Sequence, residues 1–202
     1  MSDGGRVFLV DDQPAVLKGL ERLLRSAGYA VEPYASAQAF LDGGHAADRG
    51  CLVLDLSMPE MTGLALQQAL AERASVLPVI FLTGHGDIAS GVHAMKLGAV
   101  DFLTKPVDDE RLLAAVALAM QRNRAARSEH AELASIGERL ATLTPREREV
   151  MDLVIEGRLN KQIADALGTV EKTVKVHRAR VMSKMQVRSV TALVRLVDRA
   201  RR

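Results

Sequence analysis

The chain has 202 residues, with 27 Lys and Arg against 25 Asp and Glu and a formal net charge of +2 at pH 7. This length exceeds the common size of one domain, so we expect a domain of about 120 residues with a smaller companion. No apolar stretch reaches the ~18 residues of a membrane-spanning helix, and no signal-peptide pattern begins the chain, which predicts a cytoplasmic protein that does not associate with membranes. The single cysteine, Cys51, excludes an internal disulfide and lies in an apolar run, so we expect it in the core.

The charge is divided unevenly along the chain. Residues 1–124 hold 11 basic and 15 acidic side chains, a net charge of −4, whereas residues 125–202 hold 16 and 10, a net charge of +6. A basic C-terminal region favours a polyanionic partner. An ordinary solvated surface also carries such an excess, so the charge alone does not decide between the two.

Short apolar runs in the first half of the chain alternate with segments long enough for helices. Continuous apolarity over four or five residues is typical of strands buried on both faces of a parallel sheet. Apolar residues at helical spacing in 15–27, 64–72 and 112–120 predict intervening helices. Together they predict an α/β fold, a doubly wound five-stranded parallel sheet. The runs are Val7–Val10, Ala30–Tyr34, Cys51–Leu54, Val79–Leu82 and Val100–Leu103.

Polar residues follow four of these runs. Because the carboxyl ends of parallel strands meet at one edge of a sheet, these side chains are expected to converge there. A single Asp at a strand end is often only a helix cap or a turn former, but capping does not account for the whole group. Clustered carboxylates raise one another's pKa unless a cation lies among them, which predicts a Mg²⁺ site. The residues are Asp11, Asp12, Asp55, Thr83 and Lys105.

The stretches VFLVDD, LVLDLSMPEMTG, VIFLTGHGD and AVDFLTKP resemble the signatures of receiver domains in two-component signalling, over residues 6–120. The resemblance implies a flavodoxin-like sheet with strand order 2-1-3-4-5. It implies that Asp55 accepts a phosphoryl group from a sensor histidine kinase and that Thr83 and Lys105 contact that group. Mg²⁺ would be ligated by Asp12, Asp55 and the backbone carbonyl of Ser57, with Asp11 positioning the ion.

Two further expectations follow from the resemblance, and a third concerns a neighbouring histidine. Phe102 would swing inward when Thr83 engages the phosphoryl group, although a buried Phe is also ordinary core. The Lys105–Pro106 peptide bond would be cis. His85, close to Thr83, could form a hydrogen bond near the site, but we expect it to be only an exposed loop residue.

Residues 121–139 are rich in Ala, Arg and Glu and contain no Pro, a composition that favours helix. We therefore expect a receiver domain over 1–122, a helical linker over 123–138 and a second domain over 139–202. In that second domain, Thr144, Pro145 and Glu147 have the pattern of a helix start. Gly157 and Gly168 separate further short helices, and a final amphipathic stretch is expected to pack or to form a dimer contact, which predicts a four-helix, all-α helix-turn-helix domain.

The third of these helices, over 170–185, is strongly basic. A solvated basic face is the ordinary alternative, but a basic helix after a tight turn suits the major groove of DNA. LTPREREV, NKQIADAL and TVKVHRARVMSKM resemble LuxR-type helix-turn-helix domains, and the last stretch is similar to the FixJ subgroup of NarL-like response regulators. The resemblance implies DNA contacts by Asn160, Lys161, Lys172, Thr173, Lys175, Val176, His177 and Lys184.

One departure concerns the start of this helix. The family usually has an apolar residue and then Ser before it, whereas this chain has Thr169 and then Val170. If Thr169 rather than Val170 caps the helix, the register of the first turn stays open.

The leading hypothesis is therefore a response regulator, not a turnover enzyme. It would be phosphorylated by a histidine kinase, form a homodimer when phosphorylated, bind promoter DNA and act with RNA polymerase on transcription. A metal-dependent phosphatase that uses the same carboxylates is the alternative from the enzyme class, and a DNA or RNA binder independent of phosphorylation is the third. The kinase, the promoter, the dimer face and the direction of control stay open.

Overall fold

The computed structural model describes residues 5–45, 49–84 and 88–201, and the chain divides into two compact units, Met1–Arg127 and Ser128–Arg202. Over the described residues, no helix combines the length and apolarity needed to cross a membrane. His85, expected to be an exposed loop residue, lies outside the described part of the chain.

The first unit is built on a five-stranded parallel sheet. Its strands are β1 (Arg6–Val10), β2 (Ala30–Tyr34), β3 (Gly50–Asp55), β4 (Val79–Thr83) and β5 (Asp101–Thr104). Their order is β2-β1-β3-β4-β5, and every neighbouring pair is parallel. The predicted fold class and strand order are confirmed.

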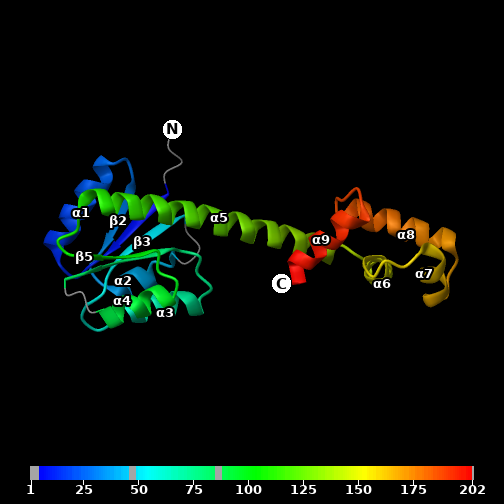
Figure 1. The fold of residues 1–202 in the computed structure, drawn as a ribbon, viewed down its shortest axis with the longest axis horizontal. Coiled ribbons are helices and arrows are strands. Elements are labelled where there is room, and N and C mark those ends of the chain that lie inside the picture. Colours follow the sequence, from blue (N-terminus) through cyan, green and yellow to red (C-terminus); the bar gives the residue numbers. More distant parts are fainter. Residues whose placement is uncertain (1–4, 46–48, 85–87, 202) are drawn as a thin grey trace. The chain divides into compact units, whose positions relative to one another are not determined.

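Helices cover both faces of this sheet (Figure 1). On one face lie α1 (Pro14–Ser26) and α5 (Asp109–Ala141), and on the other lie α2 (Ala37–Asp42), α3 (Gly63–Glu72) and α4 (Ile88–Lys96). Alternate residues of a strand face opposite sides, so the apolar runs supply two cores. Val7 and Leu9 belong to one core, and Phe8 and Val10 to the other.

Cys51 is completely buried in the core on the α1 side, as expected. Burial raises the pKa of its thiol to about 12. A thiol held in its protonated form is unreactive, so the residue is a packing element.

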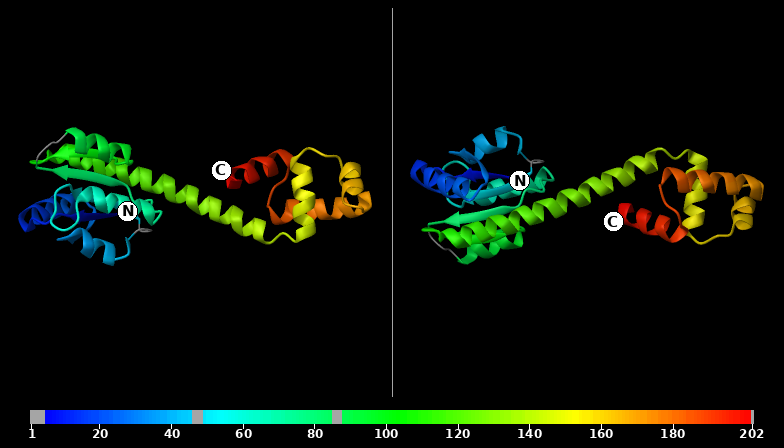
Figure 2. Two further views of the ribbon diagram at one scale, coloured as in Figure 1. Left: turned by 90° about the horizontal axis from the view of Figure 1, so that it is seen from below. Right: turned by 90° about the horizontal axis from the view of Figure 1, so that it is seen from above.

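The second unit contains α6 (Pro145–Ile155), α7 (Asn160–Ala166), α8 (Glu171–Lys184) and α9 (Val190–Arg201), shown from two further sides in Figure 2. They enclose a core that includes Val150, Ile163, Val174, Val181 and Leu193. The predicted four-helix arrangement is confirmed. The helix start is also as predicted, because Thr144 Oγ1 accepts from Glu147 N–H and the Glu147 carboxylate accepts from Thr144 N–H.

Helix α5 runs without interruption through the expected linker, 123–138. Near the end of the first unit, Asn123 is 2% exposed; its Oδ1 accepts from Gly50 N–H at 3.2 Å and its Nδ2 donates to the Val76 carbonyl at 3.1 Å. In the second unit, Arg199 forms a two-pronged ion pair with Glu132. Each half of the helix is thus fixed by side-chain bonds within its own unit.

Candidate functional site

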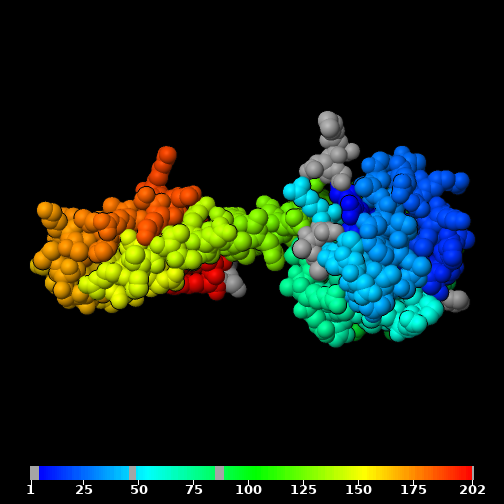
Figure 3. All heavy atoms as spheres, turned by 180° about the vertical axis from the view of Figure 1, so that it is seen from behind, coloured from blue at the N-terminus to red at the C-terminus, as the bar shows by residue number. Residues whose placement is uncertain are grey.

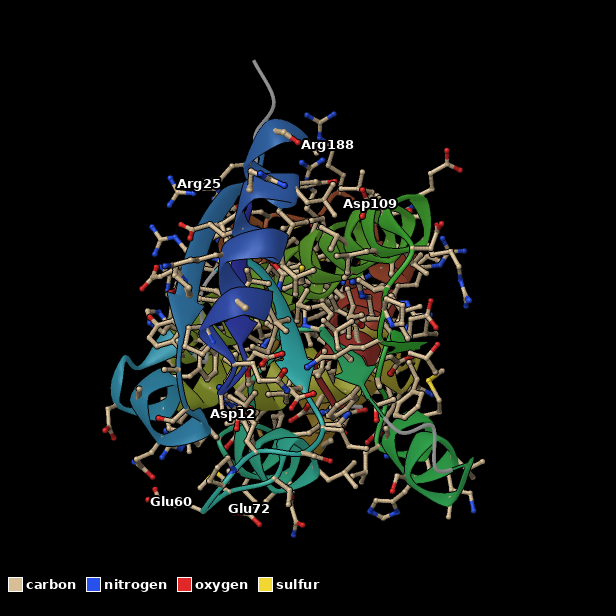
Figure 4. The ribbon with its side chains drawn as sticks, turned by 90° about the vertical axis from the view of Figure 1, so that its left-hand side faces the viewer. Asp12, Arg25, Glu60, Glu72, Asp109 and Arg188 are labelled. Carbon is tan, nitrogen blue, oxygen red and sulfur yellow. The ribbon has the colours of Figure 1, made fainter. Side chains whose placement is uncertain are left out.

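Three carboxylates converge at the carboxyl edge of the sheet. Asp11 and Asp12 follow β1, and Asp55 ends β3, which is the neighbour of β1 and is paired with it from Arg6 opposite Gly50 to Val10 opposite Leu54. One oxygen of each carboxylate lies within 4.8 Å of the others. Figure 4 labels Asp12, just before α1, and Glu60, in the loop after β3. The structure therefore brings the predicted acidic group together.

Lys105 joins this group from the end of β5. Its Nζ lies 2.6 Å from Asp11 Oδ2 and 2.9 Å from Asp55 Oδ1. Burial raises the pKa of Asp55 above its usual value even though the neighbouring ammonium opposes that change. Burial also acts to lower the pKa of Lys105, but its hydrogen bonds to Asp11 and Asp55 outweigh this and raise it. A protonated lysine is thus held against the buried carboxylates.

Some carboxylate oxygens of the acidic group accept hydrogen bonds, and one does not. Asp11 Oδ1 accepts from Gln13 N–H at 2.9 Å and Asp11 Oδ2 from Lys105. Asp12 Oδ1 is buried, and within the described chain no hydrogen-bond donor reaches it. A buried carboxylate oxygen without a donor calls for a cation, and a set of carboxylate oxygens is the ligand type that Mg²⁺ prefers. The residues present fit that ion.

The backbone around Asp55 is packed closely. A Cβ on Gly63, the first residue of α3, would lie 2.4 Å from the Asp55 carbonyl oxygen, so only Gly allows α3 to begin there. Gly63 N–H donates to the Leu56 carbonyl at 3.0 Å and closes the loop after β3. Within this loop Met58 is buried and Ser57 is exposed. A tight loop therefore holds the Asp55 carboxylate at the sheet edge.

Thr83 ends β4, the other neighbour of β3, and is 1% exposed. Its carbonyl accepts from Lys105 N–H at 2.7 Å, and the Lys105–Pro106 peptide bond is cis, as the resemblance implies. Phe102, on β5, is half-buried, with its ring centroid 6.4 Å from that of Phe81. This position is compatible with both expectations for Phe102, the switch and ordinary packing.

Helix α8 begins one residue after Val170, which occupies the cap position with φ −102° and ψ 150°. The Val170 carbonyl accepts from Thr173 N–H at 2.9 Å, and its side chain makes no capping bond. Thr169 therefore does not cap the helix, which settles the register left open by the sequence. Val174 and Val181 are buried, whereas Lys172, Lys175, Val176 and Arg180 are exposed. In Figure 3 the residues of α8, in orange, contribute an open part of the surface of the second unit.

The remaining basic and polar residues of the second unit are partly engaged with one another. Arg178 donates to Asn160 Oδ1 at 3.0 Å and ties α8 to the start of α7. The Lys184 ammonium lies 2.6 Å from Glu147 Oε2 and 2.9 Å from the Thr142 carbonyl. Lys184 therefore fastens the end of α8 to the start of α6.

Neighbouring groups limit two of the expected DNA contacts, those of Lys175 and His177. Lys161 and Lys175 are exposed, although Lys175 is 3.1 Å from Glu171 one turn earlier. His177 is half-buried, and its Nδ1 is buried with no hydrogen-bond partner in the described part of the chain. Only part of the His177 ring is thus available to a ligand. The Glu147–Lys184 and Asn160–Arg178 pairs could not be predicted from the sequence, because no local pattern links residues so far apart in the chain.

Both units match known families. Residues 7–117 match the family described as response regulator receiver domain, and residues 141–197 match bacterial regulatory proteins of the luxR family. The chain is a two-component response regulator of the LuxR/FixJ family. As such, the regulator controls transcription through a receiver and a LuxR-type DNA-binding domain.

The chain is similar to several known proteins over nearly the whole length of each. The regulator is 44% identical over 200 residues to response regulator protein TodT of Pseudomonas putida, which covers 98% of this chain and 88% of that one. It is 45% identical over 190 residues to transcriptional regulatory protein FixJ of Azorhizobium caulinodans, and this match covers 94% of this chain and 90% of that one. The solved structure of response regulator StyR has a TM-score of 0.87 at 44% identity, covering 96% of this chain and 98% of that one. These are regulatory proteins and not metabolic enzymes, which argues against the phosphatase alternative.

Proposed function

We propose that Asp55 accepts a phosphoryl group from a partner sensor histidine kinase, and that this modification promotes homodimerisation and sequence-specific binding to promoter DNA. The observation that carries the proposal is the position of Lys105 Nζ, 2.9 Å from Asp55 Oδ1, in an acidic group of which Asp11 and Asp55 are buried. In the cytoplasm, the dimer would act on transcription together with RNA polymerase. We assign the receiver to 1–122, the linker to 123–138 and the DNA-binding domain to 139–202.

The acceptor step is an attack of a carboxylate on phosphorus. A bond forms between an Asp55 carboxylate oxygen and phosphorus while the bond from phosphorus to the kinase histidine nitrogen breaks. The electron pair of the broken bond stays on that nitrogen, which takes up one proton from solvent and leaves the histidine as a neutral imidazole. Asp12, Asp55 and the Ser57 carbonyl would hold Mg²⁺, with Asp11 positioning it, and the ion would supply charge neutralisation for the transferred group. The Lys105 ammonium would lie beside an oxygen of the phosphoryl group on Asp55, and Thr83 offers a hydroxyl at the end of the strand next to that of Asp55. Phe102, packed beside α4, would follow Thr83 inward.

In the second domain, α8 would enter the major groove. Thr173, Val176 and His177 would face the bases or the walls of the groove, and the ammonium groups of Lys161, Lys172 and Lys175 would contact phosphates. Asn160 would use its amide nitrogen, because its oxygen accepts from Arg178. Lys184 would use the one ammonium hydrogen that Glu147 and Thr142 leave, so its main effect would be to position α8.

The test of phosphoryl acceptance is intact-protein mass spectrometry after incubation with a small phosphodonor and Mg²⁺. The wild type is expected to gain one phosphoryl group, and Asp55→Asn none. Asp42→Asn, which alters an exposed carboxylate of the same domain, is the matched control and should behave as the wild type. Equal modification of the wild type and Asp55→Asn would reject Asp55 as the acceptor.

A further inference from the structure

Val170 stands out because fold stability does not account for it. Its side chain is 64% exposed, and at the cap position of α8 it makes no hydrogen bond to the first-turn amides. Ser, Thr, Asn and Asp are preferred at helix caps because their side chains accept from these amides, and Val has no acceptor. An exposed apolar side chain at this position weakens the helix start and gains nothing from burial within the chain.

The residue lies on the helix that the proposed function places in the groove. Over the described residues of the second unit, the exposed large hydrophobic side chains are Leu159, Val170 and Val176. Leu159 precedes α7, while Val170 and Val176 belong to the start and the second turn of α8. Val170 lies at the N-terminal end of α8, one turn before Thr173.

Base edges in the major groove offer a specific partner to an apolar side chain. The thymine 5-methyl group is the apolar feature among the hydrogen-bond donors and acceptors of the groove. The N-terminal residues of a recognition helix are those that contact base edges. The basic residues Lys172 and Lys175, beside Val170, would hold this end of α8 against the phosphates.

We infer that Val170 is a specificity-determining residue that packs against the 5-methyl group of one thymine in each half-site. This inference rests on the proposed function, since it requires α8 in the major groove. The expected gain is that of one buried methyl group, about 0.8 kcal/mol, which corresponds to roughly fourfold in affinity.

The experiment replaces thymine by uracil, which removes only the methyl group. The full-length regulator, treated with phosphodonor and Mg²⁺, is first used to select its duplex from a random pool. Each thymine of that duplex is then replaced singly by uracil, and the dissociation constant is measured for the wild type, Val170→Ala and Val170→Ser. Leu159→Ala, which shortens a similarly exposed side chain outside α8, is the matched control. Thermal unfolding confirms that every variant is folded.

The wild type and Leu159→Ala are expected to lose about fourfold in affinity at one thymine of each half-site. Both Val170 variants should bind the thymine and uracil duplexes equally well at that position. The inference is overturned if the Val170 variants keep the full thymine preference, or if no thymine replacement affects the wild type. If no duplex is bound under any condition, both the proposed function and the inference fail. If a duplex is bound but its thymine preference does not depend on Val170, only the inference fails.

Discussion

Lys105 Nζ lies 2.9 Å from Asp55 Oδ1, which joins the end of β5 to the end of β3 across the carboxyl edge of the sheet. Burial makes Asp55 harder to ionise, since its pKa is raised above the usual value. The ammonium opposes that effect, and it lies where negative charge would gather during phosphoryl transfer. The site thus requires the lysine for the charge state of the acceptor and for the reaction.

Replacing Lys105 by Met should slow phosphorylation far more than it changes the fold. Loss of one preorganised cation at a reacting centre is expected to lower the rate by roughly 10²-fold. The measurement is the rate of phosphoprotein formation from a small phosphodonor at saturating Mg²⁺. Lys96→Met, which removes an exposed lysine of α4, should leave the rate unchanged. A Lys105→Met protein with the wild-type rate would contradict the assigned role.

Mg²⁺ should stabilise the regulator, and Asp12→Asn should remove this effect. Ligand that binds only the folded state raises the free energy of unfolding by about 2.7 kcal/mol at a concentration of 100 times the dissociation constant. Without metal, Asp12→Asn should raise the unfolding temperature, because it removes one of three crowded carboxylates. The measurement is the unfolding temperature of the wild type and of Asp12→Asn, each in Mg²⁺ and in EDTA. An equal rise of the unfolding temperature of both proteins in Mg²⁺ would rule out Asp12 as a ligand.

The Glu147–Lys184 pair should make the second domain sensitive to acid. The hydrogen bond from Lys184, together with that from Thr144 N–H, lowers the pKa of Glu147 to about 2. Because the folded-state pKa lies below the unfolded value of about 4.3, the stabilisation is complete above pH ~4.3 and is lost as the pH falls towards 2.

Glu147→Gln should accordingly lower the free energy of unfolding by roughly 2 kcal/mol at pH 7, the usual contribution of a buried hydrogen bond to a charged group. The difference from the wild type should shrink as the pH falls from about 4.3 to about 2. Urea unfolding at a series of pH values measures it. Glu149→Gln, which breaks an exposed pair with Arg146, should cost less than about 1 kcal/mol at every pH. A constant difference between Glu147→Gln and the wild type over this range would refute the ion pair as the cause.

Val170→Ser should stabilise the regulator. Ser at the cap of α8 can accept from a first-turn amide, a bond worth about 1 kcal/mol, and it removes an exposed apolar side chain. Val176→Ser, at an exposed position inside the helix, creates no cap and should show no such gain. Urea unfolding of the three proteins decides the matter, and a Val170→Ser protein no more stable than the wild type would show that another group satisfies the amides.

Most of the sheet was predictable from local pattern. The apolar runs mark all five strands, and each boundary differs from the structure by no more than one residue, as at Val79–Leu82 against Val79–Thr83. Continuous apolarity signals burial on both faces, and the polar residues that follow four of the five runs mark the edge at which the strands end. The meeting of Asp11, Asp12, Asp55 and Lys105 followed from that topology.

Other features depend on contacts that no local pattern encodes. Helix α2 has six residues, too few to display a helical period. The expected helix over 112–120 and the helical linker are parts of one helix of 33 residues. The two units divide after Arg127, and residues 121–136 contain neither Pro nor Gly that would mark this division in the sequence. The ion pair between Lys184 and Glu147 forms only when α6 and α8 are packed together. The sequence of α8 by itself therefore predicts only a basic residue at the end of a helix.

The most direct test of the account is selection of bound sequences from a random duplex DNA pool by the full-length protein in Mg²⁺, with and without a small phosphodonor. The account predicts a motif of two half-sites that is enriched by the wild type only with phosphodonor and by Asp55→Asn under neither condition. Enrichment of the same motif by the wild type to the same degree in both conditions would contradict it, because DNA binding would then be independent of Asp55 phosphorylation.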